Sequence, residues 1–178
     1  MVSNMSPFVS VFVIFLFAST SYAISGSEVK SICSQTRNPS FCLRLLMSNP
    51  NPNASLVDLT QYTINTARAK VTNTIKLIND LIAHGNSNAK SHYKLCLEHF
   101  GSDGALGDID YTQEMLKKGD YQGVNVAASA VSTDIEDCIS GDSPSDPPFH
   151  DPSDLPKNAA VIESVLDVIL VLSKLLRH

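Results

Sequence analysis

The residues whose chemistry can be inferred most directly are the four cysteines, Cys33, Cys42, Cys96 and Cys138. An even number of cysteines behind a secretory leader is typical of a disulfide framework, and four cysteines can pair in three ways. We favour Cys33–Cys42, because these residues are close in sequence. We favour Cys96–Cys138, because each lies on the apolar side of a predicted helix and the two helices should be neighbours.

The remaining reactive residues do not form a recognisable catalytic or metal site. The sequence has no G-x-S-x-G, no phosphate-binding loop and no H-E-x-x-H. His92 and His99 are seven residues apart, about 10 Å along a helix, too far to share a metal ion. Asp134, Glu136 and Asp137 are typical of a solvated helix face. We therefore predict no catalytic residue, no metal and no cofactor, and a protein that binds without catalysing a reaction.

The first 23 residues have the pattern of a secretory leader. Residues 7–18 form an apolar run too short to span a membrane, and Ser21 and Ala23 are small residues at the positions that a signal peptidase reads. We predict cleavage after Ala23 and secretion of one domain, residues 24–178. A formal net charge of −5 with scattered Lys and Arg argues against a nucleic acid or an anionic membrane as partner.

Residues 24–53 are predicted to form a helical hairpin. A short helix covers about residues 27–36, and a second helix begins with Asn38 as its N-cap and Pro39 in its first turn. Alternating Asn and Pro residues at 49–53 end this second helix. Asn53 also opens an Asn-Ala-Ser acceptor for glycosylation in what should be an exposed turn.

Residues 54–178 are predicted to form four helices. The first runs unbroken from a capping box at Ser55 to Gly85. The second covers about residues 88–118 and should kink within residues 101–107, where three glycines interrupt it. The third follows Gly119 and carries Cys138. The fold class is therefore all-α, an antiparallel up-down four-helix bundle with a disulfide-closed N-terminal hairpin.

The fourth helix, about residues 158–177, is almost entirely apolar and should be the most buried. The polar loop before it, residues 140–156, should not pack against the bundle. A membrane span or lipid-anchor signal is the alternative interpretation of this helix, but Glu163, Asp167 and Lys174 interrupt it. An acid surrounded by Val and Leu needs a partner, and we expect Asp167 to bond to a neighbouring helix.

The predicted docking surface combines the outer sides of two bundle helices. Small side chains on a helix surface allow another backbone to approach closely, whereas surfaces that only maintain solubility usually carry Lys and Glu. The alternative, that such residues are simply common on helices, has about equal weight. The predicted contact residues are Asn65, Arg68, Thr72 and Lys76 on the long helix, and Ser129, Thr133 and Asp137 on the helix of Cys138.

The chain resembles the plant invertase and pectin methylesterase inhibitor family over essentially all of residues 24–178. Residues 32–43 resemble its opening C-x-x-T-x-x-P-x-x-C-L signature. Residues 93–96 are similar to the segment around its third cysteine, residues 119–130 to the approach to the fourth, and residues 168–176 to its closing helix. Asp137 departs from the Thr that commonly precedes the fourth cysteine, and Ile139-Ser140 departs from the usual acidic pair.

The resemblance implies the pairing of neighbouring cysteines and a secreted protein of the apoplast or cell wall that blocks the cleft of a carbohydrate-active enzyme. Invertase inhibitors often carry Pro-Lys-Phe after the Gly-Asp turn, whereas Tyr121-Gln122-Gly123 stands here. This favours pectin methylesterase as the target, with cell-wall or vacuolar invertase as the alternative. A third possibility, from another class, is a helical storage or lipid-carrying protein, which would need a cavity that tight helix packing does not leave.

Overall fold

The computed structural model describes residues 23–141 and 149–178, so residues 1–22 of the predicted leader and 142–148 of the predicted loop lie outside it. The described residues form helices and no strand, which confirms the all-α class. The helices are α1 (Gly26–Cys33), α2 (Pro39–Met47), α3 (Leu56–His84), α4 (Ser87–Phe100), α5 (Ala105–Lys118), α6 (Tyr121–Ser140) and α7 (Leu155–Leu175).

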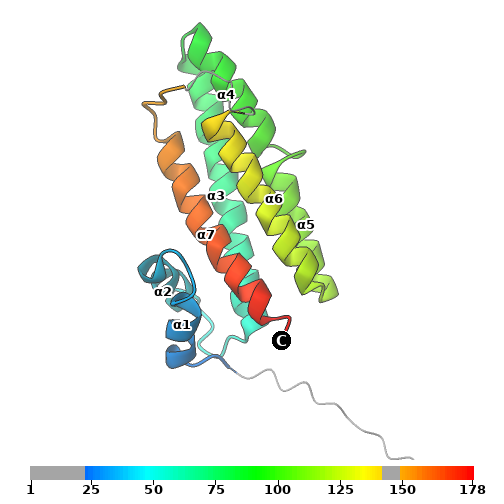
Figure 1. Cartoon of the computed structure of the whole chain (residues 1–178). Coiled ribbons are helices and arrows are strands. Elements are labelled where there is room, and N and C mark those ends of the chain that lie inside the picture. The colour runs from blue at the N-terminus through cyan, green and yellow to red at the C-terminus, as the bar shows by residue number, and fades with distance from the viewer. Residues whose placement is uncertain (1–22, 142–148) are drawn as a thin grey trace, which may run out of the picture.

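The α1–α2 hairpin lies beside the lower half of α7 in Figure 1. Asn38 caps α2 as predicted, because its side-chain oxygen accepts a hydrogen bond from the Phe41 amide at 3.1 Å. A disulfide joins Cys33 at the end of α1 to Cys42 in α2. The predicted closure of the hairpin is confirmed.

The other helices form the four-helix bundle, with α4 and α5 together making one of its four columns (Figure 1). Among the described residues, α7 packs against α3 and α6, and the α4–α5 column also packs against α3 and α6. In the described part of the chain no Cα atom of α3 comes within 8 Å of a Cα atom of α6, so these two helices are diagonally opposite across the core. This arrangement decides which surface residues can face the same partner.

Helix α3 follows the prediction closely. The Ser55 side chain accepts from the Asp58 amide, and the Asp58 carboxylate accepts from the Ser55 amide at 2.9 Å. This capping box satisfies two backbone donors that would otherwise lack a partner at the start of the helix. The helix then continues without a break to Gly85. Its buried side chains are Leu59, Thr60, Thr63, Ile64, Ala67, Val71, Thr74 and Ile78.

The predicted single helix over 88–118 is wrong, because the chain breaks there into α4 and α5 and does not merely kink. Gly101 ends α4, and Gly104 precedes the first residue of α5. A Cβ on Gly104 would overlap the carbonyl group of His99, so only glycine allows the chain to turn this tightly. The third glycine, Gly107, lies inside α5, but a Cβ there would overlap the carbonyl group of Ser102, so this glycine also allows the close approach of the chain at the break.

The second disulfide joins Cys96 of α4 to Cys138 of α6, as predicted, and both cysteines are fully buried. Phe100, at the end of α4, is fully buried close to the break. The bond and the aromatic ring hold α4 against the rest of the bundle.

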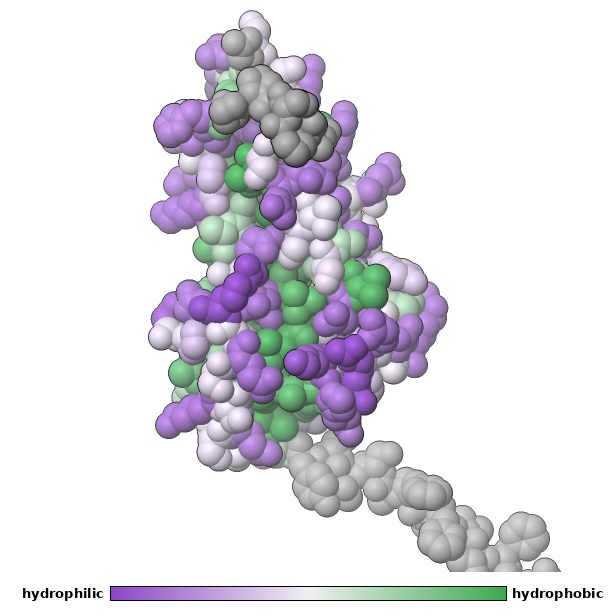
Figure 2. Space-filling model, in the orientation of Figure 1, coloured by the Kyte–Doolittle hydropathy of each residue, from purple (hydrophilic) through white to green (hydrophobic). Residues whose placement is uncertain are grey.

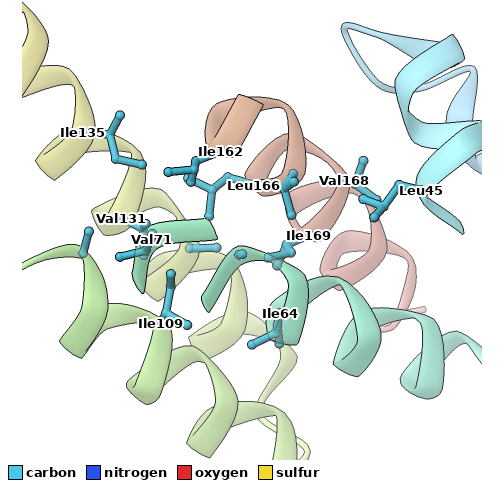
Figure 3. Close-up of a cluster of buried hydrophobic side chains, with 14 of the residues drawn as sticks. Leu45, Ile64, Val71, Ile109, Val131, Ile135, Ile162, Leu166, Val168 and Ile169 are labelled. Atoms are coloured by element: carbon cyan, nitrogen blue, oxygen red, sulfur yellow. The ribbon is translucent and has the colours of Figure 1, made fainter. Parts of the chain in front are cut away.

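Helix α7 has the largest number of buried residues, as its apolar sequence predicted. Figure 3 shows Ile162, Leu166 and Ile169 of α7 directed into the cluster that also contains Ile64 and Val71 of α3, Ile109 of α5, and Val131 and Ile135 of α6. Among the described residues, none of the helices is long and apolar enough to cross a membrane.

The described part of the loop before α7 packs, contrary to the prediction. The Phe149 ring stacks on His92 of α4, with the ring centroids 4.2 Å apart. The Tyr93 hydroxyl donates to Asp151 Oδ1 at 2.8 Å. One aromatic and one acidic residue within a polar stretch are therefore sufficient to hold the chain that leads into α7 against α4.

Candidate docking surface

The predicted contact residues lie on the bundle surface but on two different sides of it. On α3, Asn65, Arg68, Thr72 and Lys76 are exposed. On α6, Ser129 and Thr133 are exposed and Asp137 is partly buried. Because α3 and α6 are diagonal, the prediction of one surface shared by both helices is corrected to two separate candidate surfaces, the α3 stripe and the α6 stripe.

The α3 stripe borders α5, and several of its polar groups already have partners. Arg68 forms an ion pair with Asp110 of α5. Gln61 donates to the side-chain oxygen of Gln113 at 2.7 Å, and it also donates to Asn65 at 3.0 Å. A protein that covered this stripe would have to remove water from these charged and amide groups, which costs free energy unless new bonds replace the water.

The α6 stripe has smaller side chains and fewer charged groups than the α3 stripe. The Ser129 hydroxyl donates to the Asn125 carbonyl at 2.9 Å, and the Thr133 hydroxyl donates to the Ser129 carbonyl at 3.3 Å. Both hydroxyls therefore already have an acceptor within their own helix. Val126 lies on the same helix with 58% of its surface exposed. A partner can approach this stripe closely and desolvate few charged groups.

The acids near Cys138 do not all lie on a solvated face. Glu136 is exposed, but Asp134 is half-buried and its Oδ2 atom is buried without a hydrogen-bond partner. The pKa of Asp134 is raised to about 6, mainly by burial and also by the nearby carboxylates of Asp108 in α5 and Asp137, while His99 in α4 acts in the opposite direction. Burial also raises the pKa of Asp108. The broken column and α6 therefore share a site with excess negative charge.

This site should make stability fall as pH rises from about 4 to about 6. In that window the unfolded Asp134 has lost its proton, because its ordinary pKa is 3.8, whereas the folded state retains the proton. The folded state therefore binds more protons, and raising the pH destabilises it. Asp134→Asn should reduce this slope and raise the unfolding midpoint at pH 7, measured by urea denaturation across the pH range. Glu98→Gln, at an exposed position of α4, should leave the slope unchanged; an unchanged slope in Asp134→Asn would contradict the assignment.

Asp167 has the partner that its apolar surroundings required, but the partner comes from the turn between α1 and α2. The Arg37 amide donates to Asp167 Oδ2 at 2.7 Å, and the Arg37 guanidinium lies 3.4 Å from Asp167 Oδ1 and 3.7 Å from Glu163 Oε2. These bonds fasten the hairpin to the bundle. Sequence analysis missed the role of Glu163, although its spacing of four residues from Asp167 on an apolar helix was an available signal.

No group of three or more His, Cys, Asp or Glu residues within 23–141 and 149–178 could hold a metal ion. A surface pocket of about 330 Å³ lies between α6 and α7. Its lining includes Arg37, Glu136 and Glu163 as well as apolar residues, unlike the apolar tunnel that a lipid carrier requires.

Three comparisons with known proteins agree. The sequence profile of the family "Plant invertase/pectin methylesterase inhibitor" matches residues 27–164. Pectinesterase inhibitor 1 of Arabidopsis thaliana is 33% identical over 136 residues, 74% of each chain. Pectinesterase inhibitor of Actinidia deliciosa is 32% identical over 178 residues, 96% of this chain and 94% of that protein.

A crystal structure of a mutant form of a pectin methylesterase inhibitor from Arabidopsis superimposes with a TM-score of 0.70 at 28% identity. The match covers 83% of this chain and 95% of that chain. Sequence and fold thus agree with these relatives over most of the molecule, and the chain belongs to the plant invertase/pectin methylesterase inhibitor family.

Proposed function

We propose that this protein inhibits pectin methylesterase by binding over the substrate groove of the enzyme, and that it is not itself an enzyme. The observation that carries the proposal is that its curated relatives at 32–33% identity are named pectinesterase inhibitors. Tyr121-Gln122-Gly123 after the turn supports the same branch. Invertase remains the alternative target, because the family name includes it.

The α6 stripe is the proposed contact with the enzyme. Its exposed Ser129 and Thr133 present small side chains, and the exposed Val126 adds apolar area that gains free energy when water is excluded. Asp137 lies at the edge of the stripe. The α3 stripe is the second candidate, and its paired Arg68 makes desolvation more costly there.

A pair of matched substitutions decides between the two surfaces. Thr133→Arg and Thr72→Arg introduce the same bulky cation at exposed positions of the two diagonal helices. We expect Thr133→Arg to weaken inhibition of pectin methylesterase by about tenfold or more, because a long charged side chain blocks close approach. Thr72→Arg should change it by less than about twofold.

The purified secreted protein and both variants should be assayed against pectin methylesterase and invertase, after circular dichroism has shown that their melting temperatures agree. If Thr72→Arg weakened inhibition more than Thr133→Arg, the contact would be assigned to α3 instead. Inhibition of invertase alone would overturn the choice of target.

Secretion into the cell wall space, after removal of residues 1–23, is part of the proposal. Two disulfides fit an oxidising extracellular environment. The mature chain would comprise the hairpin, residues 24–53, and the bundle, residues 54–178. Asn53 is exposed between them, so a glycan on its side chain would extend into solvent. Mass spectrometry of the secreted protein before and after enzymatic deglycosylation tests whether Asn53 is modified.

A further inference from the structure

The pocket between α6 and α7, which we call the α6–α7 groove, combines an apolar floor with an acidic rim. Ile135 of α6 and Ala159 of α7 are buried and line it, and Glu136 and Glu163 contribute carboxylates. A second pocket of about 320 Å³, between α7 and the hairpin turn, shares Glu163 with the groove. On the face shown in Figure 2, hydrophobic surface is visible between polar side chains along the junction of α6 and α7.

Glu163 is the unusual group in this groove, because only one of its carboxylate oxygens has a partner. Oε2 accepts from the Ser132 hydroxyl at 3.3 Å and lies 3.7 Å from Arg37 Nη2. Oε1 is buried without a hydrogen-bond partner. A buried acceptor without a donor is costly, and burial accordingly raises the pKa of Glu163. The Glu163 side chain is nevertheless 28% exposed and lines the groove, so a positively charged donor in the groove can approach the carboxylate and stabilise its ionised form.

The charges around the groove favour a cation as that donor. The two pockets are lined by three carboxylates, those of Glu136, Glu163 and Asp167, and by one cation, Arg37. The Arg37 guanidinium already lies near two of these carboxylates. An anion would therefore meet an excess of negative charge. A lysine or arginine side chain would instead place its apolar stem on the floor and its charge beside Glu163.

We propose that the α6–α7 groove accepts a lysine or arginine side chain of the inhibited enzyme, with its charged group beside the Glu163 carboxylate. The inference rests on the proposed function and names a second contact of the same complex. Because Glu136 and Ile139 of α6 line the groove, an enzyme on the α6 stripe would reach the groove from the same helix. The groove would then fix the orientation of the inhibitor, since a buried ion pair is more directional than apolar contact.

Two variants test the groove in different ways. Glu163→Gln removes the negative charge and keeps the shape. Ala160→Trp fills the space, because Ala160 is exposed and lines both pockets. Each should weaken inhibition of pectin methylesterase by about tenfold or more. The control is Glu98→Gln, the same change of charge at an exposed position of α4, whose Cα atoms stay more than 8 Å from those of α7 in the described residues, and the inhibition constant of this variant should stay within about twofold of the parent value.

Inhibition constants should be measured at two salt concentrations, with melting temperatures compared beforehand. The inhibition constant of the parent protein should increase more steeply with salt than that of Glu163→Gln, because the ion pair is present only in the parent complex. If the parent protein inhibits the enzyme but either groove variant behaves like Glu98→Gln, the groove assignment is overturned and the proposed function stands. If the parent protein does not inhibit the enzyme, both the groove assignment and the proposed function are overturned.

Discussion

Replacing Phe100 with alanine is expected to lower the free energy of unfolding by about 3–5 kcal/mol. Phe100 is the last residue of α4 and is fully buried. Removing the ring deletes its contacts and leaves a cavity next to a backbone break that cannot rebuild itself as continuous helix. The effect should therefore fall at the upper end of what a single core substitution produces.

Urea denaturation of Phe100→Ala, followed by circular dichroism, measures this loss. Phe100→Leu keeps most of the buried volume and should cost clearly less. Tyr111→Ala removes a ring of similar size from a side chain that is 50% exposed, and it should cost about 1 kcal/mol or less. A loss of under about 1 kcal/mol for Phe100→Ala would show that the ring does not support the end of α4.

Removing the Cys96–Cys138 bond should cost about 4 kcal/mol, and removing Cys33–Cys42 should cost about 2.5–3 kcal/mol. The difference follows from the sequence separations of 42 and 9 residues, because a longer closed loop restricts the unfolded chain more. The first bond also joins α4 to α6, whereas the second lies within the hairpin.

Each pair should be replaced by two alanines, and the free energy of unfolding compared with that of the parent protein without reductant. The Cys33–Cys42 variant is the matched control, since it loses the same kind of bond and the same buried sulfur atoms. If both variants lost the same free energy of unfolding, or if the Cys33–Cys42 variant lost more, the explanation by restriction of the unfolded chain would be contradicted.

Local signals allowed much of the fold to be predicted. The capping box at Ser55 and the apolar stripe that follows it define α3, because hydrogen bonds within one turn fix where a helix begins. The dense apolar sequence of α7 predicted its burial. The break at Gly101–Gly104 was harder to predict. The free-energy cost of glycine shows that a helix is locally destabilised, but it does not show whether the helix only bends or ends there.

Contacts between residues far apart in the sequence were harder to predict. Nothing local to Asp167 identifies Arg37, 130 residues earlier, as its partner. The separation of the α3 and α6 stripes, in contrast, follows from the predicted topology. In an up-down bundle successive helices are neighbours, so the first and third columns must be diagonal. Small exposed residues on two helices therefore indicate one surface only when the helices are also adjacent.

Both disulfides join cysteines that follow one another along the chain, and neither links the hairpin to the bundle. A polypeptide that enters an oxidising compartment with its N-terminus first presents Cys33 and Cys42 before Cys96 has left the ribosome. The first bond can close before a competing thiol arrives, and the last two cysteines then have only each other. On the proposed secretory route, the order of synthesis therefore favours this one of the three possible connectivities, and we expect oxidative maturation to depend little on an isomerase.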